Sequence, residues 1–376
     1  PAVPRRFLGA GFSFFRAHLV YCFSMTRDAK EKSTQELALY RKYRPKTFED
    51  VVGQDHVTKV LEASLSKGSI AHAYVFAGSR GTGKTSVARI FAEGVGAKPY
   101  DVYEIDAASN NGVDEIREIR EAVHTLPLES PYKVYILDEA HMLSKAAWNA
   151  LLKTLEEPPK HVIFILATTE LEKVPETVLS RCQVFSFKKP THNILKSVIE
   201  DIAKKEGYTF EKSASELIAF LGDGSFRDTE SILQKIISSS KDKKISLEEV
   251  ELITGAPKSE LLNTVLSGIE EGDSNKALKA VHTAKGQNIV SKLFLKLLIE
   301  RVRIVMLMRF AKDLEAEFKE SLNDTDFVFL KGLADKKGSK ITSKILDELL
   351  RAFEETSFAA LKELPLELAL MRIVGE

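Results

Sequence analysis

Residues 78–85 of this chain read GSRGTGKT, which matches the phosphate-loop pattern G-x-x-x-x-G-K-[ST] at every fixed position. The apolar residues AYVFA at 73–77 precede the loop as a short strand, and a helical pattern starts at about Thr85. The glycines let consecutive backbone N–H groups surround a phosphate, and the helix N-terminus adds partial positive charge. A chance glycine-rich turn rarely has both flanking elements, so the segment predicts a nucleotide-binding α/β domain.

Four more strands are expected, at 102–106, 133–137, 162–167 and 184–187, with helical patterns at 113–124 and 145–155. Strands that alternate with helices predict a parallel sheet covered on both faces. After Pro190 the strand signal stops, and amphipathic helical patterns follow at 194–206, 213–221 and 229–238. The lysine-rich stretch 241–244 is expected to be a surface connection, and the chain from 247 onward again reads as all-helical.

This order predicts an N-terminal tail at 1–36, an α/β domain at 37–189, a small helical domain at 190–243 and a larger helical domain at 244–376. Residues 1–24 are expected to be an upstream segment, with a disordered tail or a targeting peptide as alternatives, because Met25 opens a polar stretch that suits a natural start. The most apolar helical stretch, 293–310, contains Lys296, Glu300 and three arginines, which argues against a membrane span.

Composition limits the partners and the compartment. Lys plus Arg and Asp plus Glu both number 54, so any nucleic-acid binding must come from a local basic surface. The two cysteines, Cys22 and Cys182, cannot form a disulfide framework and supply no CxxC pair for zinc. A reducing, cytoplasmic setting is therefore expected.

The chemistry of the expected site follows from residue types at strand ends. Lys84 would reach the β- and γ-phosphates of a nucleotide, and Thr85 would hold Mg²⁺. The third strand runs into Asp138 and Glu139, a Walker B pattern in which the first acid organises the Mg²⁺ shell and the second polarises the attacking water. Thr169 follows the fourth strand. In a sheet that places this strand between the first and the third, Thr169 is expected to contact the γ-phosphate or the water, with a strand-end cap as the alternative.

Several longer segments now carry a family resemblance: YRPKTFEDVVGQ at 43–54, EIDAASNNGVDEIR at 104–117, HMLSKAAWNALLKTLEEPP at 141–159, LSRC at 179–182 and LPLELALMRI at 364–373. Together with the phosphate loop and the Asp-Glu pair, they resemble the AAA+ ATPases of clamp loaders, in particular the gamma/tau subunits of bacterial DNA polymerase III. The resemblance covers about residues 40–373. It implies an ATPase that needs ATP and Mg²⁺, followed by a lid domain and a collar domain.

The resemblance also implies roles for two arginines. Arg181 would be an arginine finger that completes the ATP site of the neighbouring subunit, although on its own it would more often be a solvated arginine. Arg227, in GSFRD at 224–228, would reach the nucleotide from the lid, and capping by the flanking Ser and Asp is the alternative. The nucleotide contacts implied by the phosphate loop, the lid and the family's adenine pocket are Gly78, Ser79, Arg80, Gly81, Thr82, Gly83, Lys84, Thr85, Ser86, Arg227, Tyr40, Arg44, Pro45 and Val52.

The chain departs from the family in two places. Family members usually carry a zinc module of cysteines between the phosphate-loop helix and the second strand, whereas here the short segment 93–102 contains no cysteine. The module looks deleted, so no zinc is expected. The chain also stops soon after the collar-like helix, which resembles the short gamma form or a truncation rather than the long tau form.

The resemblance implies a pentameric ring that opens the sliding clamp and loads it onto primer–template DNA without sequence preference. Asn110, Arg117 and Arg120 lie where the family presents residues to DNA, but a solvated helix face with mixed charges explains them equally well. Two other functions stay open, a scaffold subunit that binds nucleotide without hydrolysing it and a DNA remodeller of the replication factor C type. The intact Lys84, Thr85, Asp138 and Glu139 argue against the scaffold.

Overall fold

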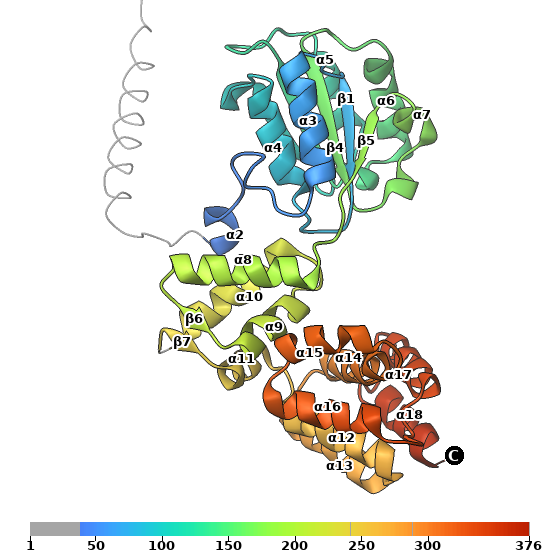
Figure 1. Ribbon diagram of the computed structural model, residues 1–376. Helices are drawn as coiled ribbons and strands as arrows, with labels where there is room; N and C mark the ends of the chain where they lie inside the picture. The colour runs from blue at the N-terminus through green and yellow to red at the C-terminus, as the bar shows by residue number, and fades with distance from the viewer. Residues whose placement is uncertain (1–37, 241, 288, 376) are drawn as a thin grey trace, which may run out of the picture.

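The computed structural model describes residues 38–240, 242–287 and 289–375, whose helices and strands form three successive bodies (Figure 1). An α/β body comes first, a small helical body follows it, and a larger helical body comes last. The predicted tail at 1–36, with Cys22 and Met25, lies outside the described residues. The fold class expected from the sequence, a parallel α/β domain followed by helices, is confirmed.

The α/β body is built on a five-stranded sheet in the order β2-β3-β4-β1-β5, and all its neighbouring strands are parallel. The strands are β1 (Ala73–Ala77), β2 (Val102–Asp106), β3 (Lys133–Asp138), β4 (Val162–Thr168) and β5 (Gln183–Ser186). β4 lies between β1 and β3, the arrangement on which the interpretation of Thr169 depends. Because parallel strands end at the same edge, this order brings the phosphate loop, the Asp-Glu pair and Thr169 to one edge of the sheet.

Helices cover both faces of the sheet, as predicted (Figure 1). On one face, α3 (Asp55–Lys67) and α4 (Lys84–Gly94) pack against the face of β1 that carries Tyr74 and Phe76. On the other, α5 (Val113–Ala122) and α6 (Lys145–Glu156) pack against Val75 and the neighbouring strands. Successive side chains of a strand point to opposite faces, so each strand contributes to both cores. The short elements of this body are η1 (Pro99–Asp101), η2 (Ala140–Met142), η3 (Leu171–Lys173) and α7 (Glu176–Leu179).

The small helical body, called the lid below, contains α8 (His192–Lys205), α9 (Lys212–Leu221), α10 (Phe226–Ser239) and α11 (Leu247–Thr254). Its core includes Val250 of α11, so it continues beyond residue 243, where the sequence analysis ends this domain. The short helix α2 (Leu39–Lys42) also packs here, and the Leu39 backbone N–H donates to Gln234 Oε1 at 2.9 Å.

The expectation that no strand follows Pro190 is wrong in one detail. The lid contains a parallel pair, β6 (Thr209–Phe210) and β7 (Lys244–Ile245), each of two residues. A segment of two residues is too short to show any alternation of apolar and polar side chains, so the sequence pattern could not reveal it. The start of β7 falls at the end of the lysine-rich stretch that was expected to be a surface connection.

The larger helical body, called the collar below, contains α12 (Ser259–Glu271), α13 (Ser274–Gly286), α14 (Ser291–Phe310), α15 (Glu315–Ser321), α16 (Asp324–Asp335), α17 (Ser343–Thr356) and α18 (Leu364–Gly375), with η4 (Lys312–Leu314) between α14 and α15. Arg301 of α14 forms a buried ion pair with Asp326 at 2.9 Å, and Ser259, Asn263 and Asn323 also donate hydrogen bonds to that carboxylate. No helix in the described part of the chain is long and apolar enough to cross a membrane.

Glu251 of α11 makes stability depend on pH. Burial raises the pKa of Glu251 to about 7, although the backbone N–H of Ser259 and the charge of Lys258 act in the opposite direction. Because the folded protein then binds this proton more tightly than the unfolded chain, stability should fall as pH rises from about 4.5 to about 7. Glu251→Gln should therefore raise the melting temperature at pH 8 but not at pH 5, through a stabilisation of at most about 3 kcal/mol.

Thermal unfolding of both proteins at pH 5 and pH 8 measures this effect. Glu248→Gln is the matched control, because Glu248 is exposed on the same helix. A shift for Glu251→Gln that is the same at both pH values would contradict the assignment.

Candidate nucleotide site

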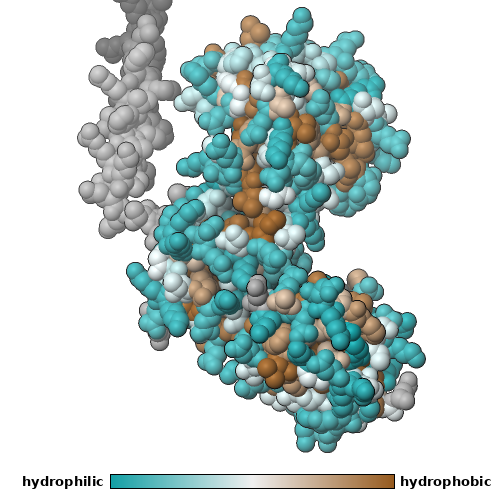
Figure 2. Space-filling view, viewed as in Figure 1, coloured by the Kyte–Doolittle hydropathy of each residue, from teal (hydrophilic) through white to brown (hydrophobic). Residues whose placement is uncertain are grey.

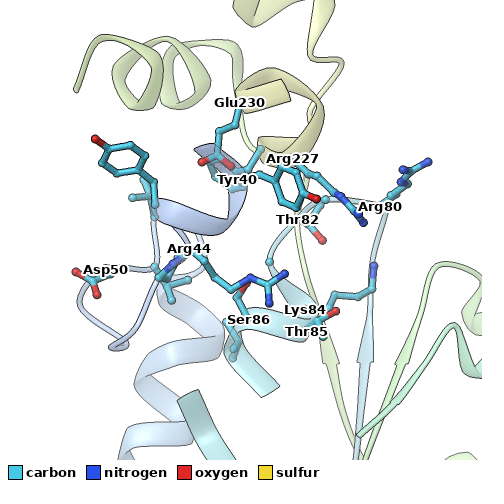
Figure 3. Close-up of a pocket in the computed structure, with 18 of the residues that line it drawn as sticks. Tyr40, Arg44, Asp50, Arg80, Thr82, Lys84, Thr85, Ser86, Arg227 and Glu230 are labelled. Atoms are coloured by element: carbon cyan, nitrogen blue, oxygen red, sulfur yellow. The ribbon is translucent and has the colours of Figure 1, made fainter. Parts of the chain in front are cut away.

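A pocket opens where the α/β body meets the lid (Figure 3). It is lined by α2 and the loop after it, by the phosphate loop and the start of α4, by the end of β3, and by α8 and α10 of the lid. Figure 2 shows hydrophobic side chains at the junction between the two bodies and also on the α/β body and the C-terminal helical body. The pocket itself combines the polar phosphate loop with apolar residues from both bodies, among them Val51, Val198 and Phe226.

The phosphate loop holds the lysine inside the pocket. Lys84 is 6% exposed, and its Nζ donates to the carbonyl oxygens of Gly78 at 2.8 Å and Ser79 at 2.9 Å. Burial lowers the pKa of Lys84, while the carboxylates of Glu139 and Asp138 raise it. Gly81 and Gly83 have φ of +72° and +98°, a backbone region that side chains other than glycine rarely adopt. The loop thus presents an ammonium group and free backbone amides to an anion.

The phosphate loop and the Walker B pair, Asp138 and Glu139, are in direct contact. Thr85 Oγ1 donates to Asp138 Oδ2 at 2.9 Å, which joins the first turn of α4 to the end of β3. A hydroxyl and a carboxylate so close together are the oxygen ligands that Mg²⁺ prefers. Glu139 has φ of +49°, a left-handed conformation that costs about 1 kcal/mol for a residue with a side chain. Strained backbone conformations of this kind cluster at functional sites.

Two side chains, Thr169 and His141, lie next to the Glu139 carboxylate at the sheet edge. Thr169 Oγ1 donates to Glu139 Oε2 at 3.4 Å. His141 Nδ1 lies 3.5 Å from the same oxygen, and its Nε2 lies 3.4 Å from Glu170 Oε1. The residue chosen from the sequence as the γ-phosphate sensor therefore lies next to the acid that would polarise water.

The lid reaches the phosphate loop through the N-terminus of α10. The Phe226 backbone N–H donates to the Gly81 carbonyl at 3.0 Å, and Ser225 caps α10 by accepting from the Asp228 N–H. Arg227 therefore lies in the first turn of a helix that begins three residues before the pattern at 229–238 predicted. Its guanidinium lies 5.1 Å from the centre of the Tyr40 ring, and both residues line the pocket (Figure 3).

Most residues singled out from the sequence meet in this pocket. Those that line it are Tyr40, Arg44, Pro45, Val52, Arg80, Gly81, Thr82, Gly83, Lys84, Thr85, Ser86, Asp138, Glu139 and Arg227. Gly78 and Ser79 do not line it but bind the Lys84 ammonium through their carbonyls, and Thr169 lies behind Glu139. Arg181 lies outside it and pairs with Glu156 at 2.7 Å.

Sequence reasoning missed the residues that complete the pocket, which are Tyr43, Asp50, Val51, Val87, Val198, Phe226 and Glu230. Burial raises the pKa of Glu230 to about 7, and the charge of Arg44 acts in the opposite direction. One signal was available for Glu230. Once Arg227 is placed in the pocket by a helix, positions three and four residues apart on that helix share its face.

Comparison with known proteins finds similarity to subunits of bacterial DNA polymerase III. A family model described as "DNA polymerase III, delta subunit" matches residues 98–191. DNA polymerase III subunit tau of Bacillus subtilis (strain 168) is 39% identical over 357 residues, covering 89% of this chain and 63% of that protein. DNA polymerase III subunit tau of Escherichia coli (strain K12) is 38% identical over 272 residues, covering 67% of this chain and 42% of that protein.

A solved structure of the RuvB Holliday junction branch migration motor of Thermotoga maritima is 23% identical, with a TM-score of 0.49, and the match covers 61% of this chain and 80% of that one. A likeness this distant adds nothing to the fold described above. The chain spans less than two thirds of the curated relatives it matches, between 42% and 63% for the two tau subunits. It is thus a homologue of the gamma/tau subunits of bacterial DNA polymerase III, similar to them over most of its own length.

Proposed function

We propose that this chain binds ATP with Mg²⁺ and hydrolyses it to ADP and phosphate, as the AAA+ motor subunit of the bacterial replicative clamp loader. The observation that carries the proposal is the contact between Thr85 and Asp138 beside the buried ammonium of Lys84. It lies in a pocket that Arg227 of the lid also lines. Similarity to gamma/tau subunits supports the same conclusion.

Each part of the site has a role in this proposal. Lys84 and the loop amides bind the phosphates, and Thr85 and Asp138 hold Mg²⁺, which supplies positive charge against the phosphate oxygens. Glu139 orients and polarises the attacking water, and Thr169 positions that carboxylate through its hydroxyl. Arg227 contacts the phosphates from the lid, so that ATP draws the lid towards the α/β body. A ligand that binds the closed arrangement better than the open one shifts the population towards it.

Arg181 is proposed to act on a neighbouring subunit. Its guanidinium donates to Glu156 Oε1 at 2.7 Å and to the Thr177 carbonyl at 2.6 Å, and its side chain is 34% exposed. Because Arg181 is not part of its own pocket but is accessible from outside, it is available to a second subunit. A guanidinium on the γ-phosphate stabilises the charge that spreads over the phosphoryl oxygens in the transition state.

The partners proposed from the resemblance are the other subunits of a pentameric ring, the sliding clamp and primer–template DNA, in the cytoplasm. No zinc is proposed, since the connection between α4 and β2 offers no cysteine. Asn110, Arg117 and Arg120 stay candidates for phosphate contacts with DNA. Arg117 already pairs with Asp114 at 2.7 Å, which leaves the solvated-face interpretation equally open.

Capture of a sliding clamp tests the proposal against the scaffold alternative. The chain, assembled with its partner subunits, should retain the clamp on a column in the presence of ATP and release it without nucleotide. Phosphate release should rise when both clamp and primed DNA are present. Clamp capture that is the same with and without ATP, together with no ATP turnover, would favour a nucleotide-binding scaffold instead. Glu139→Gln should keep ATP-dependent capture while losing turnover, because it removes the carboxylate but not the phosphate contacts.

A further inference from the structure

One end of the pocket contains a buried carboxyl group without a partner among the described residues. Glu230 of α10 is 9% exposed and lines the pocket. No residue in the described ranges makes a hydrogen bond or an ion pair with this carboxyl group, and Arg44 acts on it only through its charge. Its oxygens are not among the fully buried polar atoms, so they are accessible from the pocket. This group is therefore suited to a partner that arrives with a ligand.

The packing of α10 places Glu230 beyond the phosphate-binding end. Phe226 is attached to the phosphate loop by its hydrogen bond to Gly81, so the N-terminus of α10 marks that end of the pocket. Glu230 lies one helical turn farther, about 6 Å along the axis, and on the same face as Phe226. In Figure 3, the side chain of Glu230 projects from α10 into the pocket, on the side opposite Lys84 and Thr85. A nucleotide with its triphosphate at Lys84 would extend its base towards this region.

The surroundings of Glu230 suit a flat aromatic ring. Val51, Val198 and Phe226 line the pocket together with Glu230 and offer apolar surface to the faces of a base. Ligand sites combine such apolar walls with a few polar groups that fix orientation and give specificity. The carboxyl group of Glu230 is placed to be one of those polar groups.

We propose that Glu230 determines base specificity by accepting a hydrogen bond from the 6-amino group of adenine. The inference rests on the proposed function, because it takes the triphosphate to lie at Lys84. A base without that amino group would leave the carboxyl group buried and unpaired. At pH 8 most of the Glu230 carboxyl group is ionised, because its pKa of about 7 lies below that pH. A hydrogen bond to a charged group contributes about 1.5–3 kcal/mol, so the amino group should then improve affinity about 10-fold or more.

Titration calorimetry with two nucleotides tests the inference. The full chain is titrated at pH 8 with ATP and with purine riboside triphosphate, which carries hydrogen in place of the 6-amino group, both with Mg²⁺. The wild-type chain should bind ATP about 10-fold more tightly. Glu230→Leu should bring the ratio close to one by weakening ATP alone, and Glu230→Gln should keep most of the ratio because its amide oxygen still accepts. Glu248→Leu, at an exposed position of α11, should keep the wild-type ratio.

The outcomes separate this inference from the proposed function. Equal affinities of the wild-type chain for both nucleotides, or an unchanged ratio in Glu230→Leu, overturn the role of Glu230 while ATP binding itself stands. Failure of the wild-type chain to bind either nucleotide overturns both proposals. If Glu230→Leu does not fold, Glu230→Ala takes its place in the same titration, because it also removes the acceptor and should also bring the ratio close to one.

Discussion

Replacing Lys84 with alanine should weaken ATP binding by at least about 100-fold and remove measurable ATP hydrolysis. The buried ammonium donates to two carbonyl oxygens of its own loop, at 2.8 and 2.9 Å, and these bonds can be exchanged for bonds to phosphate oxygens. Hydrogen bonds between charged groups contribute about 1.5–3 kcal/mol each, and every 1.4 kcal/mol is about 10-fold in affinity. Two such bonds account for the expected loss, which calorimetry with ATP and Mg²⁺ measures directly.

The matched control for this prediction is Lys59→Ala, which removes an exposed lysine of α3 and should leave ATP affinity unchanged. The melting temperature of Lys84→Ala must also be compared with that of the wild-type chain, because the substitution leaves the carbonyls of Gly78 and Ser79 without their donor. A folded Lys84→Ala protein that binds ATP within about threefold of the wild type, less than 1 kcal/mol, would contradict the phosphate assignment.

Replacing Arg181 with alanine should reduce ATP turnover in the assembled complex by at least about 100-fold while leaving ATP affinity unchanged. Arginine fingers contribute about 10³–10⁵ in rate in other phosphoryl-transfer enzymes, because the guanidinium stabilises charge that develops in the transition state. In this chain Arg181 lies outside its own pocket and pairs with Glu156, an exposed ion pair that contributes at most about 1 kcal/mol. Exchanging Glu156 for a neighbour's phosphate therefore costs little.

Two further variants serve as comparisons in this experiment. Arg181→Lys keeps the charge but not the planar fork, and should recover only part of the rate. Arg351→Ala removes another exposed arginine, on α17 of the collar, and should keep wild-type turnover. Normal turnover by Arg181→Ala in the complete complex would show that the finger assignment is wrong. A loss of ATP affinity in the isolated Arg181→Ala chain would instead place the residue in its own site.

Much of the fold was predictable because its signals are local in the sequence. The strands β1 and β2 have the predicted bounds, and β3, β4, α5 and α6 begin at the predicted residues. The other boundaries lie within three residues of the predicted ones. The pair β6 and β7 was missed for two reasons. The pairing depends on contacts between segments that are distant in the sequence, and strands of two residues are too short to show an alternation of apolar and polar side chains. The continuation of the lid core into α11 was missed for the same reason.

The sequence by itself determined the phosphate-binding half of the site. Gly81, Gly83, Lys84 and Thr85 are adjacent in the chain, and their backbone and side-chain requirements can be read from residue type and spacing alone. Only the tertiary structure decided the other half. Glu230 meets the pocket because α10 is hydrogen-bonded through Phe226 to Gly81, a contact across a long stretch of chain that no local pattern encodes. Burial in the pocket raises the pKa of the Glu230 carboxyl group, although glutamate is usually found on the surface. The same placement leaves this carboxyl group available to a ligand.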